Sequence, residues 1–461
     1  MPNLEQDAIP HRSMRAIRIP VRQFALWLLV LICSGSMCLY WSRNAAAAHA
    51  SSAAPSVLNP KALTDFYPSW YATRELLLHH RDPYGAEVSR ELQIAFYGKE
   101  LDWSRPEEQR DQRRFAYPLY FVLFVAPTVW IPFYIVRTVF WWVLAVCAAL
   151  NVALWLRFVR IRLSLPALAA LFALVLTSIP VSQNLSILQP LLIPACFIAG
   201  AAVAVVSGRL FLAGVLLAIA TVKPQICLLP LAWFGLWVFS DWKRGRPLFW
   251  GFTVILSALV LGSEWLLPGW LIRYPGVLRA YAEYTRTTSF LGLLLPPILQ
   301  WLLTILELAV VAQFCWQVRR QPADSPAFAL ALAFALTLTV SIVPAVIQPF
   351  NHVLLLPVVL LAIRYWRDLQ QGSVVMRGAV WVFCLCALLS PLLAVLAVAR
   401  PLTPHLDWFL KIRPVPLAAS MAVPLAAFGF LVMLRKALFQ STSRNADAGP
   451  LNFTPTAKGE L

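Results

Sequence analysis

The sequence predicts an all-α protein that crosses a membrane many times. Of its 461 residues, 60% are hydrophobic and only 13% are charged, and the mean hydropathy is +0.70. The apolar residues form long runs separated by short basic segments, a pattern typical of polytopic membrane proteins and not of soluble domains. We expect a bundle of about 12 transmembrane helices, with a long first extracytoplasmic loop at 42–136 that contains juxtamembrane helices.

The basic residues set the expected topology. The net charge of +17 would suggest a nucleic-acid partner in a soluble protein, but here Arg and Lys lie mostly in short loops, where they orient spans. We therefore expect no nucleic-acid binding. We place on the cytoplasmic side the clusters Arg12–Arg22, Arg157/Arg160/Arg162, Lys243/Arg244/Arg246, Arg319/Arg320, Arg364/Arg367/Arg377 and Arg435/Lys436.

Between these clusters the hydropathy predicts twelve spans, which return both termini to the cytoplasm. They lie near 24–41, 137–156, 164–180, 187–206, 209–223, 225–240, 248–267, 290–316, 326–345, 350–364, 378–399 and 415–434. The chain then divides into a basic cytoplasmic N-terminus at 1–23, a membrane domain at 24–434 and a disordered cytoplasmic tail at 435–461. This arrangement indicates a multi-pass protein of a bacterial-type inner (plasma) membrane.

Two segments near the N-terminus allow alternatives. The first span precedes Ala48-His49-Ala50, which resembles a signal cleavage site, but the run is long, so we favour an uncleaved anchor. Segment 117–133 is apolar enough to cross, but counting it as a span would put Arg157 and its neighbours outside. We therefore expect it to be embedded in the membrane from the outer side.

This topology places polar residues from distant segments on one face. On the outer side it collects Asp65, Asp82, Tyr117, Gln183, Asn184, Lys223, Gln225, Arg273, Arg286 and His352. Polar groups at membrane depth are costly and are kept mainly where they line a functional cavity. We expect one cavity on the outer side.

Asp65 is the first candidate for chemistry. It lies in TDFYPSWYATRELLLHHRDPY, residues 64–84, directly after the first apolar span. A partly buried carboxylate there has a proton affinity suited to a catalytic base. The structural alternative is that Thr64 or Asp65 caps a helix that has Pro68 in its first turn.

The second acid of this stretch, Asp82, has a turn signature in Asp82-Pro83-Tyr84. If 65–82 is one helix, its seventeen residues separate the two acids by about 25 Å. They could not then act on one bond, which disfavours a hydrolase with two carboxylates.

Three further polar features lie at the ends of later spans. Lys223 ends an apolar run and is either a snorkelling lysine or a phosphate contact. His352 begins the tenth span and is either a capping group or a ligand. Gln183 and Asn184 form a polar break between two spans, which a tight loop would also explain.

With these residues in view, the chain resembles glycosyltransferase family 87, membrane transferases of the GT-C class that use a polyprenyl-phosphate sugar as donor. The resemblance covers about residues 60 to 365 and rests on Asp65, Trp70, Ala72, Asp82-Pro83-Tyr84, Tyr117-Pro118, Gln183-Asn184, Ala213-Gly214 leading to Lys223-Pro224, and His352. The chain departs from the family pattern at His79-His80-Arg81, Leu119 and Ser182.

The resemblance implies a GT-C-like bundle and an inverting mannosyltransferase-like activity on a glycolipid or glycan acceptor. It implies that Asp65 is the base and that Lys223, His352 and Arg286 hold the donor phosphate. Substrate contacts are then expected from Trp70, Asp82, Tyr84, Tyr117, Gln183, Asn184 and Gln225. The partners would be the bilayer, the lipid-linked donor and the acceptor, with no cofactor.

A metal is not expected, because the donor has a single phosphate and the chain has no DxD-type cluster. The eight cysteines all lie in or beside apolar runs, where they are typical of small core residues. The main alternative is a transporter or flippase of a lipid-linked sugar. Such a protein often has two similar halves, and the 64–84 stretch has no counterpart in the second half of the sequence.

Overall fold

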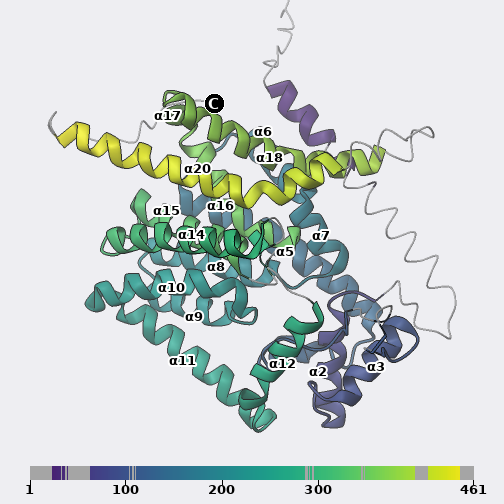
Figure 1. Cartoon of the computed structure of the whole chain (residues 1–461). Helices are drawn as coiled ribbons and strands as arrows, with labels where there is room; N and C mark the ends of the chain where they lie inside the picture. Colours follow the sequence, from purple (N-terminus) through teal and green to yellow (C-terminus); the bar gives the residue numbers. More distant parts are fainter. Residues whose placement is uncertain are drawn as a thin grey trace, which may run out of the picture.

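The computed structural model describes residues 23–39, 63–399 and 414–446, with gaps at 33, 37–38, 40, 103, 106–107, 109–110, 286–288, 290, 293–294, 344–345 and 347. In these ranges the chain is helical and contains no β-strand (Figure 1). The basic N-terminus, the alanine-rich stretch after the first span and Arg286 lie outside the described residues.

The first long loop folds into a small helical layer. It contains α2 (Tyr67–His79), α3 (Ala86–Tyr97), α4 (Phe121–Val125) and the 3-10 helix η3 (Ala126–Thr128). Its elements pack on one another, and α2 and α3 lie with α12 (Trp270–Thr285) at one corner of the molecule (Figure 1, lower right). The long first loop therefore contains helices, as predicted, and their position beside the membrane stays a prediction.

The apolar helices form the rest of the molecule. In chain order they are α5 (Phe133–Val159), α6 (Leu165–Thr177), α7 (Ile179–Ile187), α8 (Leu192–Val206), α9 (Leu210–Ala220), α10 (Pro224–Ser240), α11 (Trp242–Leu266), α14 (Pro297–Val318), α15 (Pro326–Ile342), η4 (Pro349–Leu355), α16 (Leu356–Arg364), α17 (Trp366–Gln370), α18 (Val374–Ala399) and α20 (Pro414–Ala446).

Length and composition show an all-α membrane protein. Four helices of the described part are long and apolar enough to cross a bilayer, namely α5, α11, α14 and the 421–439 part of α20. A fifth span results if α6 and α7, bent by 54°, are counted together. Seven helical stretches of 10–17 residues in the described part are apolar but shorter, among them α8, α9, α10 and α15. The predicted number of about twelve transmembrane helices is not confirmed.

Three local predictions differ from the structure. Gln183 and Asn184 do not form a loop: they lie inside α7, and the chain breaks later, at Leu188 and Gln189. Leu188 has a φ of 53° and ends α7, and Pro190 keeps Gln189 out of the helical region. The outer loop around Arg273 is the helix α12, and the predicted tail is helical as far as Ala446.

The site and the basic loops lie at opposite ends of the helices. Helix α5 begins at Phe133, which packs on Trp70 with ring centroids 5.3 Å apart, and ends beside Arg160, which pairs with Asp324 at 3.6 Å. Twenty-seven helical residues separate these ends by about 40 Å. Arg364, at the end of α16, donates to the carbonyl of Val159 at the same basic end.

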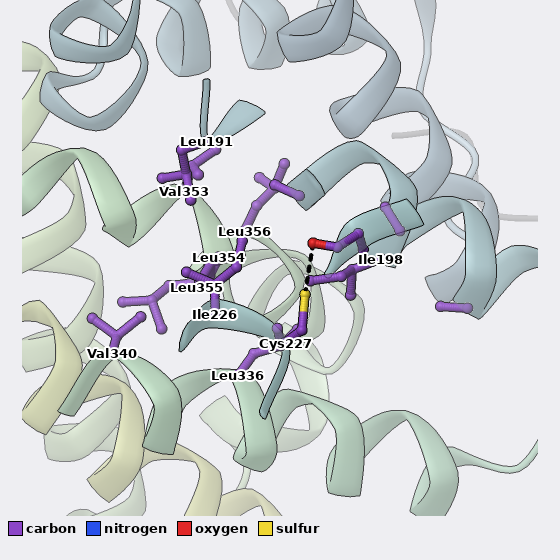
Figure 2. Close-up of a cluster of buried hydrophobic side chains, with 14 of the residues drawn as sticks. Leu191, Ile198, Ile226, Cys227, Leu336, Val340, Val353, Leu354, Leu355 and Leu356 are labelled. Carbon is purple, nitrogen blue, oxygen red and sulfur yellow. Dashed lines mark hydrogen bonds between the residues drawn. The ribbon is translucent and has the colours of Figure 1, made fainter. Parts of the chain in front are cut away.

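Buried hydrophobic side chains from several helices pack together in the core (Figure 2). It contains Leu191, Ile226, Cys227 and Val353, which follow within a few residues the polar positions 189, 223 and 352. The thiol of Cys227 donates to the carbonyl of Ala220 at 3.1 Å, which closes the turn between α9 and α10. Because these apolar residues are buried, the backbone positions of the neighbouring polar residues 189, 223 and 352 are fixed.

Helices α9 and α11 approach closely enough to exclude any side chain at two glycines. A Cβ on Gly251 would lie 2.2 Å from the carbonyl oxygen of Phe211, and one on Gly214 would lie 2.1 Å from that of Leu248. Because the obstructing atoms are backbone, the helices themselves would have to separate. Such close contacts through small residues are a main source of helix association in membranes.

We therefore expect Gly251→Ala to lower the free energy of unfolding by about 1 to 3 kcal/mol. Gly262→Ala is the matched control, because Gly262 is on the same helix and a Cβ there meets nothing within 4 Å. Thermal unfolding in detergent measures both variants. Equal melting temperatures for the two would contradict the packing described.

Candidate active site

The backbone of Asp65 is held against the end of α7. Its N–H donates to the carbonyl of Ile187 at 2.9 Å, and the following turn closes with Tyr67 N–H donating to Thr64 O at 2.9 Å. The N-cap of α2 is Phe66, and no side chain caps this helix. The capping alternative for Thr64 or Asp65 is therefore wrong, and the Asp65 carboxylate is available for other contacts.

One oxygen of the Asp65 carboxylate is paired with Arg113. Arg113 Nη1 lies 2.8 Å from Asp65 Oδ1, and the two side chains are 27% and 31% exposed. The same guanidinium is 3.5 Å from Asp111 Oδ2 and donates to the hydroxyl of Tyr97 at 3.4 Å. It also lies over the ring of Phe96, 4.7 Å from the centroid. The arginine is thus anchored on several sides.

The other carboxylate oxygen faces Gln189. Gln189 Nε2 is 3.4 Å from Asp65 Oδ2. Its Oε1 accepts from the hydroxyl of Tyr117 at 2.9 Å and from Lys223 Nζ at 3.5 Å. Gln189 therefore connects the carboxylate, the phenol and the ammonium in one hydrogen-bonded chain.

Burial is the main influence on the proton affinity of Asp65. It raises the pKa of this carboxyl above its ordinary value. Arg113 opposes the rise, nearby Asp111 adds to it, and Lys223 lowers it by a smaller amount. The result is a carboxylate that is more basic than one in water and still has two cations near it, a combination suited to accepting a proton.

Lys223 lies between α9 and α10 and is 7% exposed. Its ammonium is 5.4 Å from the centroid of the Phe350 ring, at the start of η4. The carbonyl of Phe350 accepts from Asn184 Nδ2 at 2.8 Å, which joins α7 to η4. Asp65, Gln189, Lys223 and η4 are thereby gathered at one end of the bundle.

The polar side chains that follow Phe350 are buried and unpaired within the described residues. Asn351 is 0% exposed and His352 is 5% exposed. Neither the amide atoms of Asn351 nor the ring nitrogens of His352 have a hydrogen-bond partner. Buried polar groups of this kind are usually satisfied, so a binding partner for them is chemically favourable.

The triplet Asp82-Pro83-Tyr84 lies next to the network and contacts it through Tyr117. Asp82 Oδ1 accepts from the N–H of Tyr84 at 2.9 Å, and Asp82 is ion-paired with Arg273 of α12. The hydroxyl of Tyr84 donates to the carbonyl of Tyr117 at 2.8 Å. Because Tyr117 in turn bonds Gln189, this triplet positions the site and agrees with the turn interpretation of Asp82.

The remaining predicted contacts are separate from this network. Trp70 is 5% exposed and its indole donates to the carbonyl of Thr128 at 3.1 Å, so it packs α2 against η3. This packing gives Trp70 no contact with the network. Gln225 lies in the first turn of α10 and Gln183 inside α7.

Two members of the network were not predicted, Arg113 and Gln189. Arg113 is one of many charges in the long loop, and only the folding of that loop shows which one meets Asp65. Gln189 has a sequence signal, since a polar residue directly before a proline marks a helix break beside an apolar run.

Helices that cross a bilayer, together with a buried carboxylate linked to an ammonium, define a membrane protein with an enzyme-like site. The model of glycosyltransferase family 87 matches residues 115–349, about half of the chain. The chain belongs to glycosyltransferase family 87. No curated protein and no solved structure matches it. The matched segment includes Tyr117, Gln189 and Lys223, and Asp65 precedes it.

Proposed function

We propose that the protein transfers a sugar, with inversion, from a polyprenyl-phosphate donor to a hydroxyl of a glycolipid or glycan acceptor. The observation that carries this proposal is the link from Asp65 through Gln189 to Lys223 in a membrane glycosyltransferase. The side-chain amide of Gln189 lies between the Asp65 carboxylate, which can act as a base, and the Lys223 ammonium. An acceptor hydroxyl and a leaving phosphate need those two groups.

In the proposed mechanism Asp65 acts as general base. The acceptor oxygen attacks the anomeric carbon while its proton passes to the Asp65 carboxylate. The bond between the anomeric carbon and the phosphate oxygen breaks, and polyprenyl phosphate leaves with the bonding electrons. A single displacement of this kind inverts the anomeric configuration. The raised pKa of Asp65 makes it a better proton acceptor than an exposed aspartate.

Lys223 and His352 are the groups we assign to the leaving phosphate. An ammonium held in a buried site stabilises developing negative charge more strongly than one in water. Among the described residues, the ammonium of Lys223 contacts Gln189 through a long hydrogen bond and the Phe350 ring, so it retains N–H donors for phosphate oxygens. His352 offers a ring N–H without a protein partner in the described part.

The side of the membrane follows from the distribution of charge. Arg160 and Arg364 lie at the end of the bundle opposite the site. Basic loops of membrane proteins stay on the cytoplasmic side, so we place the site on the extracytoplasmic face. Mannose is the sugar that the family resemblance favours, and the donor is expected to reach the site from within the bilayer.

The direct test uses the purified full-length protein in lipid vesicles. Polyprenyl-phosphate mannose and a membrane glycolipid extract are added, and the lipid-linked sugar and new glycolipids are measured. Consumption of donor with formation of a mannosylated lipid is the expected result. Movement of the donor across the bilayer without any transfer would instead identify a flippase and overturn the proposal.

Transfer is expected to be independent of divalent metal, because one phosphate presents less charge than a diphosphate and two cationic or polar groups are assigned to it. Incubation with a chelator should leave the rate unchanged within about twofold. Full loss in chelator, restored by added Mg²⁺ or Mn²⁺, would contradict this. Among the described residues, no group of three His, Cys, Asp or Glu side chains could hold a metal ion, and metal independence remains a prediction.

A further inference from the structure

Arg113 has a backbone conformation that L-residues rarely adopt. Its φ is 55°, in the left-handed region that favours glycine, and a side chain there costs roughly 1 to 2 kcal/mol. Its guanidinium nevertheless contacts Asp65, Asp111, Tyr97 and Phe96 at once. A strained residue with such a well-held side chain indicates that the side chain is used.

The two oxygens of the Asp65 carboxylate have hydrogen bonds of different strength. Oδ1 receives the short bond from Arg113 at 2.8 Å, whereas among the described residues Oδ2 has only the long contact from Gln189 at 3.4 Å. A strong hydrogen bond lowers the basicity of the oxygen that accepts it and fixes the plane of the carboxylate. The weakly bonded Oδ2 is then the oxygen left to accept a proton.

We propose that Arg113 is a positioning residue that acts through Asp65: it holds Oδ1, aims Oδ2 at the acceptor hydroxyl, and places a positive charge beside the carboxylate. This inference rests on the proposed function and adds to it a role for a residue that the family match, which begins at 115, does not include. Arg113 itself does not touch the reacting atoms in this assignment.

The charged and titratable groups around Asp65 determine the direction of the pH effect. Arg113 and Asp111 lie on the loop before Tyr117, Lys223 lies between α9 and α10, and Tyr281 on α12 is near enough to interact. Asp111 opposes ionisation of Asp65, whereas Arg113 and Lys223 favour it. Without Arg113, the larger of these two favourable influences is lost, and the pKa of Asp65 would rise.

The test is the pH profile of kcat/KM for transfer by the full-length protein in lipid, with wild type, Arg113→Gln and Arg113→Lys. A base must be unprotonated to act, so activity falls as the pH drops through its pKa. This fall in kcat/KM at low pH is the acid limb of the profile. Loss of the arginine should move the acid limb to higher pH by roughly 1 to 3 pH units. The deficit of Arg113→Gln relative to wild type should be largest at the acid end of the profile and should shrink as the pH is raised.

The conservative variant Arg113→Lys keeps the charge and should keep the limb within about half a pH unit of wild type. Arg90→Gln is the matched control, because Arg90 is an exposed arginine of the same loop that pairs with Glu100. A loss in Arg113→Gln that is equal at every pH would show a structural role. A higher KM for the donor with an unmoved limb would show direct phosphate binding. Either result overturns the inference.

A second readout does not need turnover. A hydrophobic carbodiimide adds to protonated carboxyls, so mass spectrometry of Asp65 labelling against pH follows its protonation. The midpoint should rise in Arg113→Gln by the same amount as the acid limb. If Asp65→Asn is inactive, but Arg113→Gln changes neither the labelling midpoint nor the acid limb, the role of Arg113 is wrong and the proposed function stands. If Asp65→Asn remains active, the proposed function itself is wrong.

Discussion

Asp65→Asn is expected to lower sugar transfer by about 10²- to 10⁴-fold, the contribution typical of a general base. Asparagine has nearly the same shape and can still accept the hydrogen bond from Arg113, but its amide cannot take the acceptor proton. The backbone contact with Ile187 is unaffected by the substitution. Donor binding should therefore survive, and the loss should appear in kcat.

Three measurements make this result specific. The melting temperature of Asp65→Asn should stay within a few degrees of wild type, which excludes unfolding as the cause. Asp324→Asn is the matched control, because Asp324 is a half-exposed carboxylate at the opposite end of the bundle, paired with Arg160. It should transfer sugar at the wild-type rate. A folded Asp65→Asn protein with wild-type kcat would remove Asp65 as the base.

Lys223→Met is expected to lower kcat by about 10²- to 10³-fold, as for loss of one preorganised group that stabilises transition-state charge. Lys223 is 7% exposed and has no carboxylate within ion-pairing distance in the described structure. Taking such a charge out of water is costly, and methionine fills a similar volume without that cost. Stability should therefore be equal or greater while activity falls.

This opposite change in stability and activity separates a functional lysine from a snorkelling one. A lysine that only extends its charge to an interface could be replaced by methionine with little effect on transfer. Lys243→Met, at the exposed start of α11 on the basic side, is the control and should keep its activity. Wild-type kcat in Lys223→Met would contradict the assignment of the leaving-group site.

The structure brings three of the predicted residues to one end of the bundle. Lys223 follows an uninterrupted apolar run, so the helix before it must bring it to the end of the bundle. Asp65 lies just before α2 and contacts Ile187 at the end of α7, and Asn184 inside α7 contacts Phe350 of η4. Hydrophobic periodicity and the placement of charge are sufficient for this level of prediction.

The predictions that failed depend on backbone breaks. The polar pair Gln183-Asn184 suggested a loop, but Asn184 lies inside α7, where its amide nitrogen donates to the carbonyls of Pro180 and Phe350. The helix ends at Leu188 because this residue has a left-handed backbone conformation, which a leucine in the sequence does not predict. Arg286 lies outside the described residues, so its predicted contact with the donor phosphate stays a prediction.

Residue types and their order are sufficient to predict an all-α membrane protein with one basic end and to single out Asp65 and Lys223, because the transfer of apolar and charged groups between water and lipid depends mainly on residue type. Arg113 and Gln189 join the candidate site only through the folding of the chain. Forty-eight residues separate Asp65 from Arg113 and 124 separate it from Gln189. Contacts over such separations depend on how helices pack, and side-chain packing is a property of the whole fold and not of any segment.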